Sequence, residues 1–272
     1  MYAFAYARPE SLAEARTLLA SDVEPRLLAG GQTLLPSMKH RLTAQSTLID
    51  LQDIPELQGI REEEGAIVVG AMARHAQVAS SVIVRSRIPA LAVLAGGIAD
   101  PSVRNMGTIG GSLANSDPAA DYPAALVGLG GTVLTDRRAI EADDYLIGMF
   151  QTALEPDEII VAVRFPIPAR AGYCKLPNRA SGYVLAGAFV SETEGIVRVA
   201  INGVGDHAFR LSAAEQALAH EFGPLPDSVC MPDIELMVDD PAAPAAFKQA
   251  LVPAAVNRAI KRALAPSFEG KA

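Results

Sequence analysis

The first 169 residues alternate between short apolar runs and stretches in which apolar residues recur every three or four positions. Runs of about four to eight apolar residues are typical of buried strands, and the recurring spacing is typical of amphipathic helices. Ser11 and Glu14 form a capping box that predicts the first helix, and a second helix is predicted over 73–81. Strands are predicted at 25–31 (running into a turn), 46–51, 66–70, 131–135 and 158–167. Such alternation is typical of the α/β class.

The pattern changes after RFPIPARAG (164–172), where two prolines and a glycine indicate a domain boundary near residue 170. Beyond it, strand-like segments at 183–191 and 196–205 flank the turn sequence ETEG, which predicts a hairpin. One helix is predicted to start at Ser212 and another to cover roughly 245–265. An antiparallel sheet with helices packed on it, an α+β arrangement, accounts for this part.

Composition narrows the range of functions. The 272-residue chain carries 23 basic and 31 acidic residues, a net charge of −8, which disfavours nucleic acid as a partner. It lacks an apolar run long enough to span a bilayer, and its N-terminus does not resemble a signal peptide, so a cytoplasmic location is expected. The chain has two cysteines and four scattered histidines, so we predict neither a metal ligand nor an iron–sulfur cluster in it.

Two double glycines are the candidate ligand-binding positions in the sequence. Gly30–Gly31 is predicted to end a strand, and Gly110–Gly111 is interpreted as a second loop of the same form. Glycines let a ligand approach the backbone closely, and consecutive exposed N–H groups bind anions. Two such loops could hold a diphosphate from two sides. The nearby Asp121 is suited to hydroxyl groups rather than phosphates.

Simpler interpretations remain open for these residues. Double glycines end strands in many proteins, Asp121 could cap a helix, and Asp117 could cap the turn into the following proline. A GxGxxA match at Gly203, Gly205 and Ala208 follows a strand, but no helix starts directly after it, so we interpret it as a turn. The sequence GxxxxGK[ST] of a P-loop is absent. The spacing alone therefore names no ligand.

Longer motifs do. AGGQTLLPSMKHRL (29–42) followed by RNMGTIGGSLANSDPAADYPA (104–124) resembles the FAD-binding medium subunit of molybdenum hydroxylases, the relatives of carbon monoxide and xanthine dehydrogenases. The resemblance covers nearly the whole chain. It includes the opening pattern Phe4, Tyr6, Arg8, Pro9 and the segments LIDL (48–51), VVGAMARH (68–75), PDEIIVAVRFP (156–166) and KLPNRASGYVLAGAFV (175–190).

The resemblance implies a fold and its division into domains. A PCMH-type FAD-binding domain is expected over residues 1–169, made of two α/β subdomains that divide near residue 55 and hold the cofactor between them. A C-terminal α+β flavoprotein domain is expected over residues 170–272, with an antiparallel sheet and helices, closing over the flavin.

The resemblance also implies which residues contact FAD. One segment is expected to wrap the diphosphate with its backbone: Ala29, Gly30, Gly31, Gln32, Thr33 and Leu34. A second approaches the diphosphate and the ribityl chain from the other side: Thr108, Gly110, Gly111 and Ser112. Asp121 matches the aspartate that binds the ribityl hydroxyls. The remaining contacts are expected along the loop beside the cofactor, near the adenine and near the isoalloxazine ring: Ala99, Ile160, and the pair Lys175 and Tyr183.

Function follows from the same resemblance. The chain is expected to be an oxidoreductase subunit that carries FAD, takes electrons from the [2Fe–2S] clusters of a small subunit and passes them to an external acceptor. A large subunit would hold the molybdenum cofactor, and the assembly would be a heterotrimer or its dimer. No catalytic residue is assigned within this chain. Two alternatives stay open: a freestanding FAD-dependent oxidoreductase, and a scaffold subunit without cofactor.

The chain departs from the family pattern in two places. Some relatives carry an iron–sulfur cluster in an insertion of this subunit, which two cysteines cannot ligate. Many relatives have Arg-x-x-Asp where this chain has NRASGY, with Gly182 before Tyr183. The second departure affects the contacts expected beside the flavin ring rather than FAD binding itself.

Overall fold

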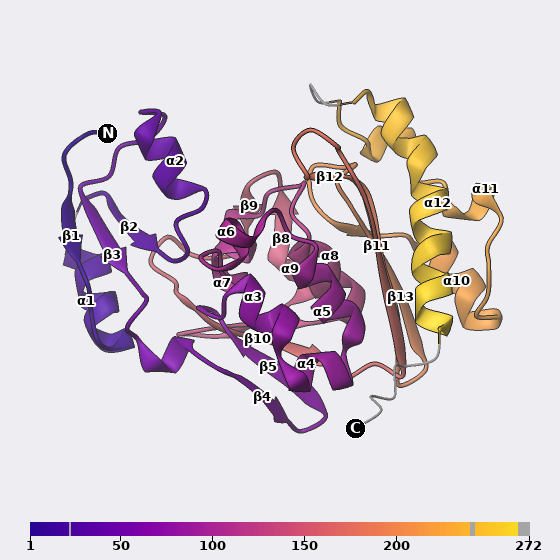
Figure 1. The fold of residues 1–272 in the computed structure, drawn as a ribbon, viewed down its shortest axis with the longest axis horizontal. Coiled ribbons are helices and arrows are strands. Elements are labelled where there is room, and N and C mark those ends of the chain that lie inside the picture. Colours follow the sequence, from indigo (N-terminus) through magenta and orange to yellow (C-terminus); the bar gives the residue numbers. More distant parts are fainter. Residues whose placement is uncertain (22, 240–242, 266–272) are drawn as a thin grey trace.

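A three-stranded, a five-stranded and a four-stranded sheet follow one another along the chain (Figure 1). The computed structural model describes residues 1–21, 23–239 and 243–265. Within them, no helix has the length and apolar character that crossing a membrane requires.

The N-terminal part is built as strand, helix, strand, helix, strand. Its parallel strands β1 (Ala5–Ala7), β2 (Pro25–Leu28) and β3 (Thr47–Asp50) lie in the order β1-β3-β2, linked by α1 (Leu12–Ser21) and α2 (Leu34–Lys39). The first helix begins where its capping box predicts. The Glu14 N–H donates to Ser11 Oγ at 3.2 Å, while the Glu14 carboxylate accepts from the N–H of Glu10 rather than of Ser11.

The central sheet is antiparallel throughout, in the order β4-β5-β10-β6-β7. Its strands are β4 (Ile60–Glu63), β5 (Ala66–Gly70), β6 (Thr132–Thr135), β7 (Ala139–Glu141) and β10 (Ile160–Pro166), and η1 (Pro55–Leu57) precedes β4. The predicted strands at 66–70, 131–135 and 158–167 are confirmed. All five residues of β5 are buried, which explains its continuous apolar run.

Helices occupy the long connection between β5 and β6. They are α3 (His75–Ser80), α4 (Val82–Arg87), α5 (Pro89–Gly96), α6 (Pro101–Arg104), α7 (Ile109–Asn115) and α8 (Tyr122–Leu129). A second connection, between β7 and β10, contains α9 (Ala142–Tyr145) and the short pair β8 (Leu146–Gly148) and β9 (Gln151–Thr152). Only α3 was predicted among these helices.

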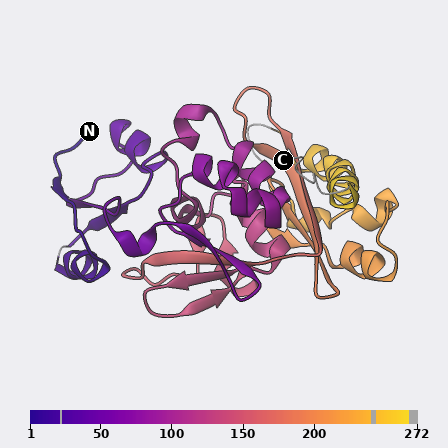
Figure 2. The same cartoon turned by 60° about the horizontal axis from the view of Figure 1, so that its bottom comes forward.

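The C-terminal sheet is antiparallel, in the order β11-β12-β13-β14, with α12 (Ala245–Leu264) along its outer face (Figures 1 and 2). Its strands are β11 (Arg170–Pro177), β12 (Val184–Thr193), β13 (Ile196–Asn202) and β14 (Phe209–Arg210); α10 (Ser212–His220), α11 (Asp227–Cys230) and η2 (Ile234–Leu236) lie between β14 and α12. The predicted hairpin is confirmed, with Glu194 and Gly195 at positive φ between paired strands. The GxGxxA match lies between β13 and β14, as expected for a turn.

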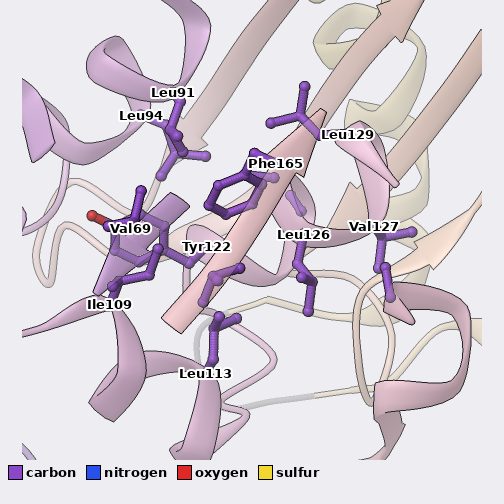
Figure 3. Packing of buried hydrophobic residues seen from close by; sticks show 14 of the residues in the cluster. Val69, Leu91, Leu94, Ile109, Leu113, Tyr122, Leu126, Val127, Leu129 and Phe165 are labelled. Carbon is purple, nitrogen blue, oxygen red and sulfur yellow. The ribbon is translucent and has the colours of Figure 1, made fainter. Parts of the chain in front are cut away.

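Helix α8 lies between the central and C-terminal parts, and all eight of its residues are buried. A single apolar cluster contains Leu126 and Phe165, which Figure 3 labels, and extends to Phe189 and Ala200 beyond residue 170. Gly128 allows the close approach, because a Cβ there would lie 2.8 Å from the Phe189 ring. The predicted boundary at 169/170 falls just before β11 and stays a proposal, and the parts on either side share one core.

The Tyr122 hydroxyl is fully buried in this cluster and has no hydrogen-bond partner among the described residues. We expect Tyr122→Phe to leave the free energy of unfolding unchanged or to raise it by about 1 kcal/mol, because it removes an unsatisfied polar group. Urea unfolding measures the change. Phe165→Ala, in the same cluster, is expected to lose about 3–5 kcal/mol. A loss above about 1.5 kcal/mol in Tyr122→Phe would show that the hydroxyl has a partner.

Candidate functional site

One cleft of about 1240 Å³ lies where the three parts of the chain meet. Its wall is drawn from the end of β2, the starts of α7 and α8, the start of β10, and the C-terminal sheet at β11 and the turn before β12. Every residue that the family resemblance assigns to FAD lines this cleft: Ala29, Gly30, Gly31, Gln32, Thr33, Leu34, Ala99, Thr108, Gly110, Gly111, Ser112, Asp121, Ile160, Lys175 and Tyr183. Their individual contacts with FAD stay predictions.

The segment 29–34 lines the cleft and has free backbone donors. It runs from the end of β2 to the first residue of α2, as the first double glycine predicts, and Gly31 has φ of 70°. The N–H groups of residues 30 to 34 donate to no acceptor among the described residues, whereas the Leu35 N–H already donates to Gly31 O at 3.1 Å. Free consecutive N–H groups at a helix start are what an anion requires.

The second double glycine differs from its prediction. Gly110 and Gly111 lie in the first turn of α7 rather than in a loop at a strand end. Their N–H groups donate within the chain, from Gly110 to Ala71 O at 2.9 Å and from Gly111 to Thr108 Oγ1 at 3.1 Å. The Ser112 N–H likewise donates to Thr108 O. Thr108 caps this helix. Residues 110–112 therefore form a wall of the cleft but offer it no free backbone donors.

The two glycine segments, 29–34 and 106–112, pack backbone against backbone, with no side chain between them. A Cβ on Gly30 would lie 2.4 Å from Met106 O and 2.5 Å from Gly107 Cα. A Cβ on Gly110 would lie 2.6 Å from Ala71 Cβ, so this glycine lets α7 pack on the residue after β5. Both contacts are shorter than real Cβ contacts allow, and glycine is therefore required at each position.

Asp121 is held by two side chains of β11. The Tyr173 hydroxyl donates to Asp121 Oδ1 at 2.6 Å, and Lys175 Nζ lies 3.0 Å from Asp121 Oδ2. Asp121 is 5% exposed; burial raises the pKa of its carboxyl, and Lys175 and Tyr173 act in the opposite direction. The Asp121 side chain makes no cap bond to α8, so the capping alternative is wrong. The Lys175 side chain is itself only 12% exposed.

The other assigned residues come from two turns and from the start of a strand. Ala99 has φ of 39°, and its carbonyl accepts from Arg104 at 2.7 Å. Ile160 begins β10, and the exposed Tyr183 lies in the turn before β12. Asp117 Oδ1 accepts from the Ala119 N–H at 2.9 Å, which confirms the turn interpretation for that carboxylate.

The cleft also contains residues that were not predicted. His75, the first residue of α3, is 5% exposed, and a Cβ on Gly107 would lie 2.6 Å from its Nε2. Ile147 and Phe150 reach the cleft from the β8–β9 hairpin, with Phe150 at φ of 55°. Glu158 is buried and accepts from Arg138 and Thr135. Only the motif around His75 (VVGAMARH) could have indicated one of them, because the others contact the cleft through tertiary packing.

Few positive charges line the cleft. Among the described residues of its wall, Arg26 and Lys175 are the only lysine or arginine, and Lys175 is paired with Asp121. A diphosphate would therefore be held mainly by backbone N–H and hydroxyl groups, as at other helix N-termini. The same described residues contain no cluster of three or more His, Cys, Asp or Glu arranged for a metal ion.

Comparison with known proteins assigns the family. Residues 2–168 match the model of the FAD binding domain in molybdopterin dehydrogenase. The chain belongs to this family. It is thus an FAD-dependent oxidoreductase subunit of the molybdenum hydroxylase type, and FAD is its cofactor.

Similarity extends over nearly the whole chain. The carbon monoxide dehydrogenase medium chain of Hydrogenophaga pseudoflava is 35% identical over 96% of this chain and 97% of its own. The nicotine 6-hydroxylase medium subunit of Paenarthrobacter nicotinovorans is 38% identical over 79% of this chain and 80% of its own. Among solved structures, quinoline 2-oxidoreductase from Pseudomonas putida 86 superposes with a TM-score of 0.85 at 31% identity, covering 96% of this chain and 97% of that one.

The departure at Gly182 has a local cause. Gly182 has φ of 76°, its N–H donates to Asn178 O at 2.8 Å, and the Asn178 N–H donates back to Tyr183 O. An aspartate at this position would have to adopt a left-handed conformation that glycine adopts without strain. Glycine is therefore the residue that fits the turn before β12 in this chain.

We expect Gly30→Ala to weaken FAD binding by about tenfold or more, because its Cβ forces the two glycine segments apart. Isothermal titration of the apoprotein with FAD measures the dissociation constant. Gly223→Ala is the matched control, since a Cβ there meets nothing within 4 Å. Wild-type affinity in Gly30→Ala would show that the contact between the segments is irrelevant to binding.

Burial lowers the pKa of His75 to about 4, with the Arg104 charge adding to the effect. Between pH 6.5 and 4 the unfolded chain therefore binds a proton that the folded chain excludes, and the free energy of unfolding falls as the pH drops through this window. Relative to His75→Gln, wild type is expected to lose about 2–3 kcal/mol from pH 7 to 4.

Urea unfolding at both pH values tests this expectation. The exposed His40 supplies the control substitution, His40→Gln. Parallel pH dependence in wild type and His75→Gln would contradict a neutral, buried His75.

Proposed function

We propose that this chain is the FAD-carrying electron-transfer subunit of a multi-subunit molybdenum hydroxylase. In this role it takes electrons from the [2Fe–2S] clusters of a small partner subunit and passes them to an external acceptor. The observation that carries the proposal is the single cleft that gathers every residue the family pattern assigns to FAD. Similarity to a protein named as a medium chain over 96% of this chain, and to one named as a medium subunit over 79% of it, supports the proposal.

The described residues suggest an orientation for FAD. The free N–H groups of residues 30 to 34 would hold the diphosphate, with the Thr33 hydroxyl beside them. Asp121 would accept from the ribityl hydroxyls, and Ile160 would contact the adenine end. Lys175 and Tyr183 would lie near the isoalloxazine ring. The segment 108–112 would close the opposite wall by its shape.

When bound, FAD supplies the redox chemistry, taking up two electrons that arrive singly and releasing them to the acceptor. The residues of this chain bind and orient the cofactor, and burial of Asp121 and Thr108 keeps water from the groups that hold it. No residue of this chain is given a role in acid–base chemistry on a substrate. Oxidation of the substrate would take place on the large subunit, at its molybdenum cofactor.

The proposal extends to the partner subunits, the cellular location and the domain division of the chain. The large molybdenum subunit and the small [2Fe–2S] subunit would assemble with it as a heterotrimer or its dimer in the cytoplasm. Residues 1–169 would form the PCMH-type FAD-binding domain, divided near residue 55, and residues 170–272 the C-terminal flavoprotein domain. This last domain would complete the cleft through β11.

Stopped-flow reduction tests the proposal. The full chain, loaded with FAD, is mixed anaerobically with a dithionite-reduced [2Fe–2S] subunit of this enzyme family, after removal of excess dithionite. We expect the flavin absorbance near 450 nm to bleach, and a ferredoxin from an unrelated plant-type system is the control. Bleaching by a small organic substrate without any iron–sulfur protein would favour the freestanding oxidoreductase. Failure to take up FAD would favour the scaffold.

A further inference from the structure

The C-terminal sheet forms hydrogen bonds with the residues that lead into α8. The Gly203 N–H donates to Pro118 O at 3.0 Å, and the Val184 N–H reaches Ala119 O at 3.5 Å. Asn202 Nδ2 donates to Ala120 O at 2.7 Å. Together with the Tyr173–Asp121 bond, the sheet contacts each residue from 118 to 121 in turn. The carboxylate of Asp121 ends a segment whose course is set by β11, β12 and β13.

Both carboxylate oxygens of Asp121 are fixed, but by groups of different rigidity. Lys175 Nζ, on Oδ2, also lies 3.3 Å from Gly97 O and is carried by a long flexible side chain. Tyr173 is 3% exposed, and its ring packs against Phe189 with centroids 6.0 Å apart. A buried aromatic ring has few accessible rotamers, so its hydroxyl is the stiffer constraint.

We propose that Tyr173 is a positioning residue of the FAD site, which orients the Asp121 carboxylate toward the cleft through its hydroxyl. The inference rests on the proposed function, because it requires Asp121 to contact FAD. Tyr173 does not itself line the cleft. It makes the C-terminal sheet a functional part of the cofactor site and not merely a cover.

Tyr173→Phe tests the proposal in the full chain. The substitution keeps the ring and its packing while removing the hydroxyl that reaches Asp121. Ser191→Ala is the matched control: Ser191 is also buried in the C-terminal sheet, and its hydroxyl donates to Gly128 O in α8 at 2.6 Å, away from the cleft. Both variants lose one buried hydroxyl bond between the same two parts of the structure, and only one loses a bond to Asp121.

The readouts are the FAD dissociation constant, the visible spectrum of the bound flavin and the Tm of the apoprotein. We expect Tyr173→Phe to raise the dissociation constant by about tenfold and to shift the flavin spectrum, while Ser191→Ala changes neither. The Tm of the two variants is expected to fall by similar amounts.

Two results overturn the proposal in distinguishable ways. Equal FAD affinity in both variants, with wild type binding FAD, would show that Tyr173 has only a structural role. Absence of FAD binding by wild type would instead overturn the proposed function, and this inference with it.

Discussion

The contact between two bare backbone segments is the constraint on which the cleft depends. Gly30 lies against the peptide of Met106 and Gly107 at a distance that excludes any Cβ. This contact brings the end of β2 to the start of α7, although the strand and the helix lie about 80 residues apart in the chain. Gly110, in the first turn of α7, packs equally closely against Ala71, the residue after β5. The cleft is the space that remains between segments packed in this way.

The two glycine segments differ in whether their backbone N–H groups are free. The N–H groups of residues 30 to 34 have no acceptor among the described residues, whereas the N–H groups of residues 109–112 are bonded within the chain. An anion held in the cleft would therefore receive backbone donors from one side and a rigid wall from the other. The net charge of −8 and the two cationic side chains along the wall fit a site that recognises phosphate by geometry rather than by charge.

The sequence predicted the elements whose pattern is local. Continuous apolar runs predicted β5 and β10, and ETEG predicted the β12–β13 hairpin. The family motifs predicted which residues line the cleft. Helix α7 was missed because Gly110 and Gly111 have low helix propensity, and its start depends on the Thr108 cap and on packing against Ala71. Helices α5 and α8 are apolar on nearly all sides and show no periodicity.

Other features could not have been predicted because they arise from tertiary contacts. Strand β11 begins at the proposed domain boundary, where proline and glycine indicate a linker, and Tyr173 and Lys175 reach Asp121 only once that strand joins the sheet. His75 is neutral because the surrounding structure buries it, not because of its sequence neighbours. The core shared across residue 170 follows from the burial of α8 between two sheets.

Residue-resolved amide hydrogen exchange, with and without FAD, tests the central claim most directly. If the free N–H groups of residues 30 to 34 hold the diphosphate, FAD must slow their exchange strongly, while the amides of 109–112 are already protected and change little. Binding of FAD that leaves residues 30 to 34 exchanging as fast as before, or that protects 109–112 instead, would contradict this account of the site.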